Sequence, residues 1–95
     1  MYYFYVLYSL KDNRLYKGYS SEPGARYLRH QSGGVASTRY RRPLVLIYLE
    51  SYQEKAEALA RERWAKSKDG GPLLLEILIA KGVLDSRKKL ASVIG

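Results

Sequence analysis

The first third of the chain contains residues that could hold a phosphate group and move a proton. Tyr5 and Tyr16 carry phenol groups, and Arg26 and His30 follow one helical turn apart. A guanidinium can bind two phosphate oxygens at once, and a phenol or an imidazole can take or give a proton. A single carboxylate further along, that of Glu62, could complete the set. Together these groups suit phosphodiester hydrolysis, which needs a neutralised phosphate, an activated water and a protonated leaving oxygen.

The two tyrosines should lie on neighbouring strands of one hairpin. Side chains alternate across a strand, so Tyr3 and Tyr5 share one face, and Tyr16 and Gly18 share a face of the returning strand. If the register brings these faces together, the two phenols converge. Gly18 would then leave room for a phosphate or for a closely packed helix.

The pattern along the whole chain predicts a small α+β fold. The expected strands are residues 2–9, 15–19 and 44–50, and the expected helices are residues 20–31, 51–68, 73–81 and 87–93. The third strand is apolar throughout and should be central or covered on both faces. Ser51 to Glu54 matches a capping box that would open the following helix.

These elements imply a three-stranded, mostly antiparallel sheet flanked by helices. Their order is strand, strand, helix, strand, helix, followed by a helical tail. Residues 1–68 would form the main domain, and residues 69–95 would be a helical tail packed on the same single domain.

The composition favours a polyanionic partner. The formal net charge is +8 and the sequence pI is about 9.8, and ten tyrosines accompany the basic residues. Aromatic rings beside arginines suit nucleic acid better than lipid headgroups, so no membrane partner is expected. The chain has no cysteine, no positively charged leader pattern and no apolar run of membrane-spanning length, which favours a cytoplasmic protein.

The order and spacing of these residues resemble the GIY-YIG nuclease domain, and most closely its small stand-alone bacterial members. The first motif falls on Tyr3-Phe4-Tyr5 and the second on Tyr16-Lys17-Gly18, with Tyr16 eleven positions after Tyr5. Arg26 follows Gly18 by eight positions, and His30 comes one turn later. The resemblance covers roughly residues 2–68, and the segment 58–63 places the family's metal-binding glutamate on Glu62.

The resemblance implies a nuclease with one divalent metal ion, Mg²⁺ or Mn²⁺, held by Glu62. It implies that Gly18 is a structural residue of the second motif. It also implies five catalytic residues, which are Tyr5, Tyr16, Arg26, His30 and Glu62. The chain departs from the family in replacing the leading Gly-Ile by Tyr3-Phe4. It also carries a charge, Lys17, inside the second motif and has no asparagine late in the sequence.

A tyrosine base faces the obstacle that its reference pKa is about 10. A nearby Arg26, a metal ion or a partly charged His30 would lower this pKa. Tyr5, alone or through His30, would then activate the water, while Tyr16 would position the phosphate or a water.

The expected function is a metal-dependent DNA endonuclease selective for nucleic-acid structure rather than base sequence. Expected nucleic-acid contacts are the basic residues Lys17, Arg39, Arg41, Arg42 and Lys66. Alternatives are a basic nucleic-acid-binding module without turnover and a protein-interaction domain using the Leu73–Ala80 surface. The sequence leaves open RNA as a substrate and a monomer or a homodimer as the working form.

Some of these residues also have ordinary structural interpretations. Glu62 and Lys66 could be a common surface pair at helical spacing. Ala58 and Ala65 flank Glu62 on its helix face, and their small size would let a substrate approach.

Overall fold

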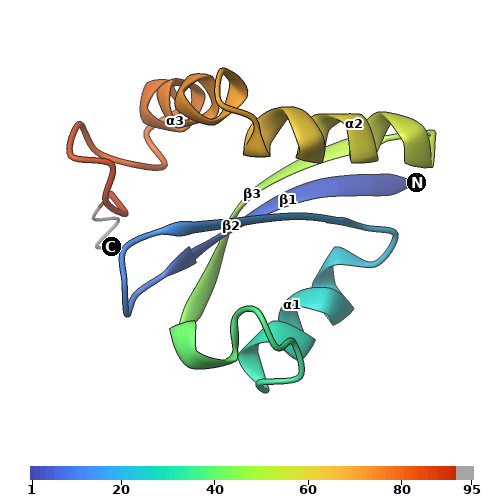
Figure 1. The fold of residues 1–95 in the computed structure, drawn as a ribbon, viewed down its shortest axis with the longest axis horizontal. Helices are drawn as coiled ribbons and strands as arrows, with labels where there is room; N and C mark the ends of the chain where they lie inside the picture. Colours follow the sequence, from blue (N-terminus) through green and yellow to red (C-terminus); the bar gives the residue numbers. More distant parts are fainter. Residues whose placement is uncertain (92–95) are drawn as a thin grey trace.

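The computed structural model describes residues 1–91 and contains three strands and three helices (Figure 1). The elements are β1 (Tyr2–Ser9), β2 (Leu15–Ser20), α1 (Pro23–Gln31), β3 (Leu44–Tyr52), α2 (Lys55–Lys66) and α3 (Gly70–Ala80), with a short 3-10 turn, η1 (Arg39–Arg41), before β3. The predicted α+β class and three-stranded antiparallel sheet are confirmed.

The sheet has the order β2-β1-β3, with both pairs antiparallel. The β1–β2 register places Tyr5 opposite Gly18 and Leu7 opposite Tyr16. The intervening turn contains Asn13 at φ 58°, the left-handed conformation that asparagine tolerates. The hairpin therefore sets the first motif directly against the second.

Helices cover both faces of the sheet, with α2 and α3 on one side and α1 on the other (Figure 1). The alternation of β1 divides its side chains between the two sides. Phe4, Val6 and Tyr8 pack in the larger core, which includes Leu74 and Leu78 of α3. The smaller core on the α1 side is built from Tyr5, Leu7 and Leu44, with partly buried Tyr16, Tyr27 and Leu46 packed against it.

β3 is an edge strand, so of the two predicted alternatives a central position is wrong and cover on both faces is confirmed. The central strand is β1, which pairs on both sides. The apolar run in β3 arises because its side chains reach both cores: Leu46 packs on the α1 side, while Ile47 and Tyr48 pack on the α2 side.

The start of α2 also differs from its prediction. β3 continues to Tyr52, which pairs with Tyr2, so Ser51 lies in a strand and cannot cap a helix. Glu54 is the N-cap instead, and it forms a reciprocal capping box with Glu57. The helix ends at Lys66, two residues before its expected end.

The tail has one helix where two were predicted. The apolar face of α3 packs into the larger core through Leu74 and Leu78. Residues 85–91 form turns and an isolated bridge between Leu84 and Leu90 instead of the expected basic helix, whose remaining residues lie outside the described part. Among residues 1–91, no helix has the length and apolar character needed to cross a membrane.

Candidate active site

The predicted catalytic residues converge around one surface hollow of about 440 Å³. Tyr5 reaches it from β1, Tyr16 and Gly18 from β2, Arg26 from α1 and Glu62 from α2. The hollow is also lined by Tyr2, Tyr19, Ser20, Ser21 and Lys55. Although α2 lies on the other face of the sheet from α1, Glu62 shares this hollow with both phenols. His30 lies beneath it, fully buried.

Gly18 makes space for the ring of Tyr5. A Cβ atom at position 18 would lie 2.5 Å from the Tyr5 hydroxyl oxygen and 2.6 Å from Cζ. Real Cβ atoms do not approach other atoms so closely, so any larger residue here must displace the phenol. Gly18 in the second motif is thus required so that the ring of Tyr5 in the first motif can occupy its position.

His30 joins the two phenols from below. Its Nε2 is 3.0 Å from the Tyr5 hydroxyl oxygen, and its Nδ1 is 2.7 Å from Oγ1 of Thr38. Its ring also meets that of Tyr16 edge-on, with centroids 4.9 Å apart. Burial, together with the nearby positive charge of Arg26, lowers the pKa of His30 to about 4. The imidazole is therefore neutral at pH 7, so of the three groups considered from the sequence, a partly charged His30 does not lower the pKa of Tyr5.

Tyr5 keeps its proton in the protein alone. Burial raises the pKa of Tyr5 above its usual 10.0, and the neighbouring guanidinium of Arg26 only partly offsets this effect. Because the pKa of His30 is lowered to about 4 while that of Tyr5 is raised, transfer of the phenol proton to His30 is unfavourable. His30 is therefore a poor final acceptor for a proton.

Glu62 offers one carboxylate to the hollow. Its Oε2 lies 3.6 Å from Nζ of Lys66, so the ordinary i,i+4 pair is present beside any functional role. The flanking Ala58 and Ala65 are fully buried, so their small size serves close packing of α2 rather than access for a substrate. In residues 1–91, no cluster of three or more His, Cys, Asp or Glu side chains could enclose a metal ion. A single carboxylate in a hollow that also contains Arg26 would suit Mg²⁺, which keeps several waters when few protein groups bind it.

Comparison with known proteins identifies the family that shares this arrangement. The family model described as the GIY-YIG catalytic domain matches residues 1–70. The chain belongs to the GIY-YIG family. This domain is a nuclease domain, so the chain is a nuclease by family and its substrate class is nucleic acid.

Similar GIY-YIG relatives are small proteins named only as UPF0213. The UPF0213 protein SH2523 of Staphylococcus haemolyticus is 44% identical over 61 residues, covering 63% of this chain and 73% of the relative. The UPF0213 protein SERP0126 of Staphylococcus epidermidis is 42% identical over 60 residues, covering 62% and 73%. The solution NMR structure of the UPF0213 protein BH0048 from Bacillus halodurans has 32% identity and a TM-score of 0.50, covering 81% of this chain and 85% of that one.

Two of the predicted nucleic-acid contacts are engaged elsewhere in this GIY-YIG domain. Tyr16 and Gly18 face the hollow, so Lys17 between them on β2 points to the opposite face of the sheet. There its Nζ donates to the Ala65 carbonyl at 2.9 Å. Burial, with the charge of Lys66, lowers the pKa of Lys17. Arg41 forms a two-pronged ion pair with Asp12, with Nε to Oδ2 at 2.7 Å, and this pairing holds the pKa of that carboxyl at about 2.

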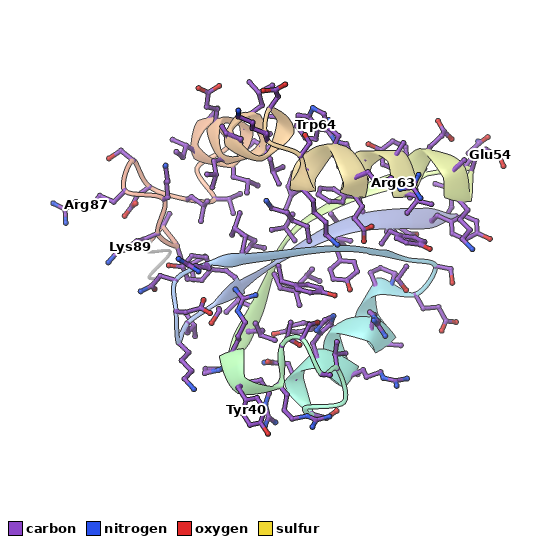
Figure 2. All side chains as sticks on the ribbon, viewed as in Figure 1. Tyr40, Glu54, Arg63, Trp64, Arg87 and Lys89 are labelled. Carbon is purple, nitrogen blue, oxygen red and sulfur yellow. The ribbon has the colours of Figure 1, made fainter. Side chains whose placement is uncertain are left out.

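Arg39 and Arg42 line a second hollow, of about 490 Å³, on the loop between α1 and β3. Their guanidinium groups also brace this loop by donating to the Gly33 and Gln31 carbonyls. Tyr40 lines the same hollow, and 76% of its surface is exposed. Figure 2 labels its side chain on this loop. Sequence analysis missed Tyr40 and the buried Thr38: neither belongs to a motif, and only the folded loop shows that one faces solvent while the other contacts His30.

Proposed function

We propose that this chain is a metal-dependent DNA endonuclease that selects its substrate by structure rather than by base sequence. The observation that carries the proposal is the single hollow in which Tyr5, Arg26 and Glu62 meet. A base, a phosphate-binding cation and a metal ligand are the parts that phosphodiester hydrolysis requires. A role in DNA repair or recombination would follow from such a preference.

Each residue of the hollow has a task in this scheme. Arg26 binds two oxygens of the scissile phosphate and stabilises the negative charge that develops there. Tyr5, in its phenolate form, takes the proton of the attacking water, and Tyr16 orients the phosphate or that water. Glu62 would hold Mg²⁺ or Mn²⁺, which when bound supplies positive charge to the phosphate and to the leaving oxygen.

Substrate choice would come from surfaces around the hollow. Lys66 stands at its rim, with Nζ 5.9 Å from the centre of the Tyr16 ring, and could contact a flanking phosphate. The loop hollow adds Arg39 and Arg42 for phosphates and Tyr40 as an exposed ring on which an unpaired base could stack. Such contacts recognise backbone and unstacked bases, which favours branched, nicked or flapped DNA.

The proposal is tested by incubating the purified full-length protein with branched and plain duplex DNA, with Mg²⁺, with Mn²⁺ and with chelator. We expect metal-dependent nicking that is faster on branched DNA. Tyr5→Phe should reduce the rate by about 100-fold or more, because it removes the general base. Glu62→Gln should abolish the dependence on metal together with most of the activity.

Matched controls separate the chemistry from general damage. Tyr3→Phe removes a phenol two residues away on the same strand, and Glu76→Gln removes an exposed carboxylate on α3. Both should nick DNA like the unaltered protein. Nicking at full rate with chelator would contradict the metal requirement. Salt-sensitive DNA binding without any cleavage would instead identify a binding module that kept the fold.

A further inference from the structure

A chain of three buried side chains leads from the hollow into the interior. Tyr5 contacts His30 through Nε2, and His30 contacts Thr38 through Nδ1, at 3.0 and 2.7 Å respectively. His30 and Thr38 have no exposed surface, and Tyr5 has only 2%. At this depth each polar hydrogen needs a hydrogen-bond acceptor.

Counting donors and acceptors fixes the direction of both hydrogen bonds. Within residues 1–91, the Thr38 hydroxyl has one hydrogen-bonding partner, Nδ1 of His30, and no buried side-chain nitrogen or oxygen lacks a partner. If Nδ1 carried the proton, the Thr38 hydroxyl hydrogen would be a buried donor without an acceptor. Nδ1 must therefore accept, and the single proton of the neutral ring resides on Nε2.

This tautomer makes His30 a donor to the Tyr5 oxygen. Because Nε2–H points at that oxygen, the hydroxyl hydrogen of Tyr5 must point elsewhere, towards the hollow. A donor aimed at the phenol oxygen stabilises its phenolate form, whereas an accepting imidazole would stabilise the neutral phenol. The other ionisable groups facing the pair are Tyr16 from β2, Arg26 from α1 and Glu62 from α2.

The backbone around Thr38 is held firmly enough to impose this arrangement. The amide of Thr38 donates to the Val35 carbonyl, and its own carbonyl accepts from the amide of Arg41. The Ser9 hydroxyl ties the Arg41 carbonyl to the end of β1 at 2.6 Å. Thr38 is thus fixed relative to β1, the strand that carries Tyr5.

We propose that Thr38 is a positioning residue of the nuclease site: its hydroxyl donates to Nδ1 of His30, fixes the tautomer protonated at Nε2 and so turns His30 into a hydrogen-bond donor to Tyr5. The effect on catalysis rests on the proposed function, while the tautomer does not. In the proposed step Tyr5 first loses its hydroxyl proton to solvent through the hollow. The proton of the attacking water then passes to the phenolate oxygen, whose negative charge it neutralises, and His30 keeps its own proton throughout.

The tautomer can be measured directly because His30 is the sole histidine of the chain. In full-length protein labelled with ¹⁵N-histidine, we expect an Nε2 signal with an attached proton and an unprotonated Nδ1 signal at neutral pH. Thr38→Val keeps the shape and removes the hydroxyl, so the protonated Nε2 population should fall and Nδ1 protonation should become detectable. Thr38→Ser keeps the hydroxyl and should preserve the unaltered spectrum.

Nicking kinetics then test the consequence for catalysis. Thr38→Val should lower kcat by about 10- to 100-fold, the usual loss when an orienting partner is removed, with KM for DNA unchanged. Thr38→Ser should restore most of the rate. A protonated Nδ1 in the unaltered protein would overturn the proposal, even if Thr38→Val does not fold. Full activity of folded Thr38→Val would overturn the positioning role.

These outcomes are separable from a failure of the proposed function. If the unaltered protein nicks no DNA with either metal, the endonuclease proposal fails and the catalytic role of Thr38 fails with it. The ¹⁵N spectra then still decide whether Thr38 sets the tautomer.

Discussion

Tyr5 performs two tasks with different parts of one side chain. Its ring fills the smaller core between the sheet and α1, while its hydroxyl contacts His30 and borders the hollow. The resemblance to the GIY-YIG family predicted that Tyr5, Tyr16, Arg26 and Glu62 belong to one site, and all four line the same hollow. It could not predict the burial of His30, because that depends on a loop, residues 32–43, folding back over the end of α1.

Gly18 offers the sharpest test at the scale of single residues. We expect Gly18→Ala to displace the Tyr5 phenol, because the added methyl would lie 2.5 Å from its oxygen. The overpacking should lower the free energy of unfolding by about 1–3 kcal/mol. The nicking rate should also fall, by a factor whose free-energy equivalent is at least as large as this loss of stability. Urea unfolding and nicking rates at a temperature where the protein stays folded would measure the two effects.

Gly24→Ala is the matched control for this change. A Cβ at position 24, inside α1, has no atom within 4 Å, and alanine is favoured over glycine in a helix by about 1 kcal/mol. This variant should be slightly more stable and fully active. An active Gly18→Ala protein with an unmoved Tyr5 ring would contradict the steric account.

At the scale of elements, local signals located the ends of α1 to within one turn. The predicted end at Gln31 is correct, while the helix begins at Pro23 rather than at residue 20, because Ser20 still belongs to β2. The predicted end of β3 was wrong because tertiary pairing decided it: Tyr52 extends the strand by pairing with Tyr2. The apolar run of β3 reflects the predicted cover on both faces and not a central position. Lys17 was assigned to nucleic acid because sequence cannot show that its ammonium reaches the end of α2.

Lys17 and Lys66 lie near the same end of α2 and should have opposite roles. Lys17 donates to the Ala65 carbonyl, one of the unpaired groups at a helix C-terminus, so Lys17→Met should lower the free energy of unfolding by about 1–2 kcal/mol. Lys66 is half exposed and makes only a long pair with Glu62, so Lys66→Met should change stability by less than about 0.5 kcal/mol.

DNA-binding titrations at several salt concentrations complete this comparison. Lys66→Met should weaken binding and reduce its salt dependence, while Lys17→Met should leave both unchanged. The assignment of Lys17 to the helix end is wrong if Lys17→Met weakens DNA binding without loss of stability.

At the scale of the whole molecule, the fold binds protons differently from the unfolded chain. An exposed histidine has a pKa near 6.5, while that of His30 in the folded protein is about 4. Between these values the unfolded chain binds one proton more, so stability is fully present above pH 6.5 and is lost as the pH falls towards 4. The loss amounts to about 3 kcal/mol over this window.

Urea unfolding of the full-length protein between pH 7 and pH 4.5 would measure this dependence. The lowered pKa values of Asp12 and Glu50 act mainly below this range, because the ordinary pKa values of these carboxyls, 3.8 and 4.5, lie at or under its lower limit. His30→Gln, which cannot titrate, should show a flat profile over the same range. A flat profile in the unaltered protein would refute the neutral, buried state of His30.

The separate roles of the Tyr5 ring and hydroxyl also bear on how a protein of this kind could lose its catalytic activity. Everything hydrophobic about that ring would survive in phenylalanine, which fits the same space above Gly18. Loss of the Tyr5 hydroxyl oxygen would remove the proposed general base, while the sheet, the basic loop and the proposed nucleic-acid contacts would remain. A nuclease and a nucleic-acid-binding protein without activity could thus share this fold and differ by that one atom.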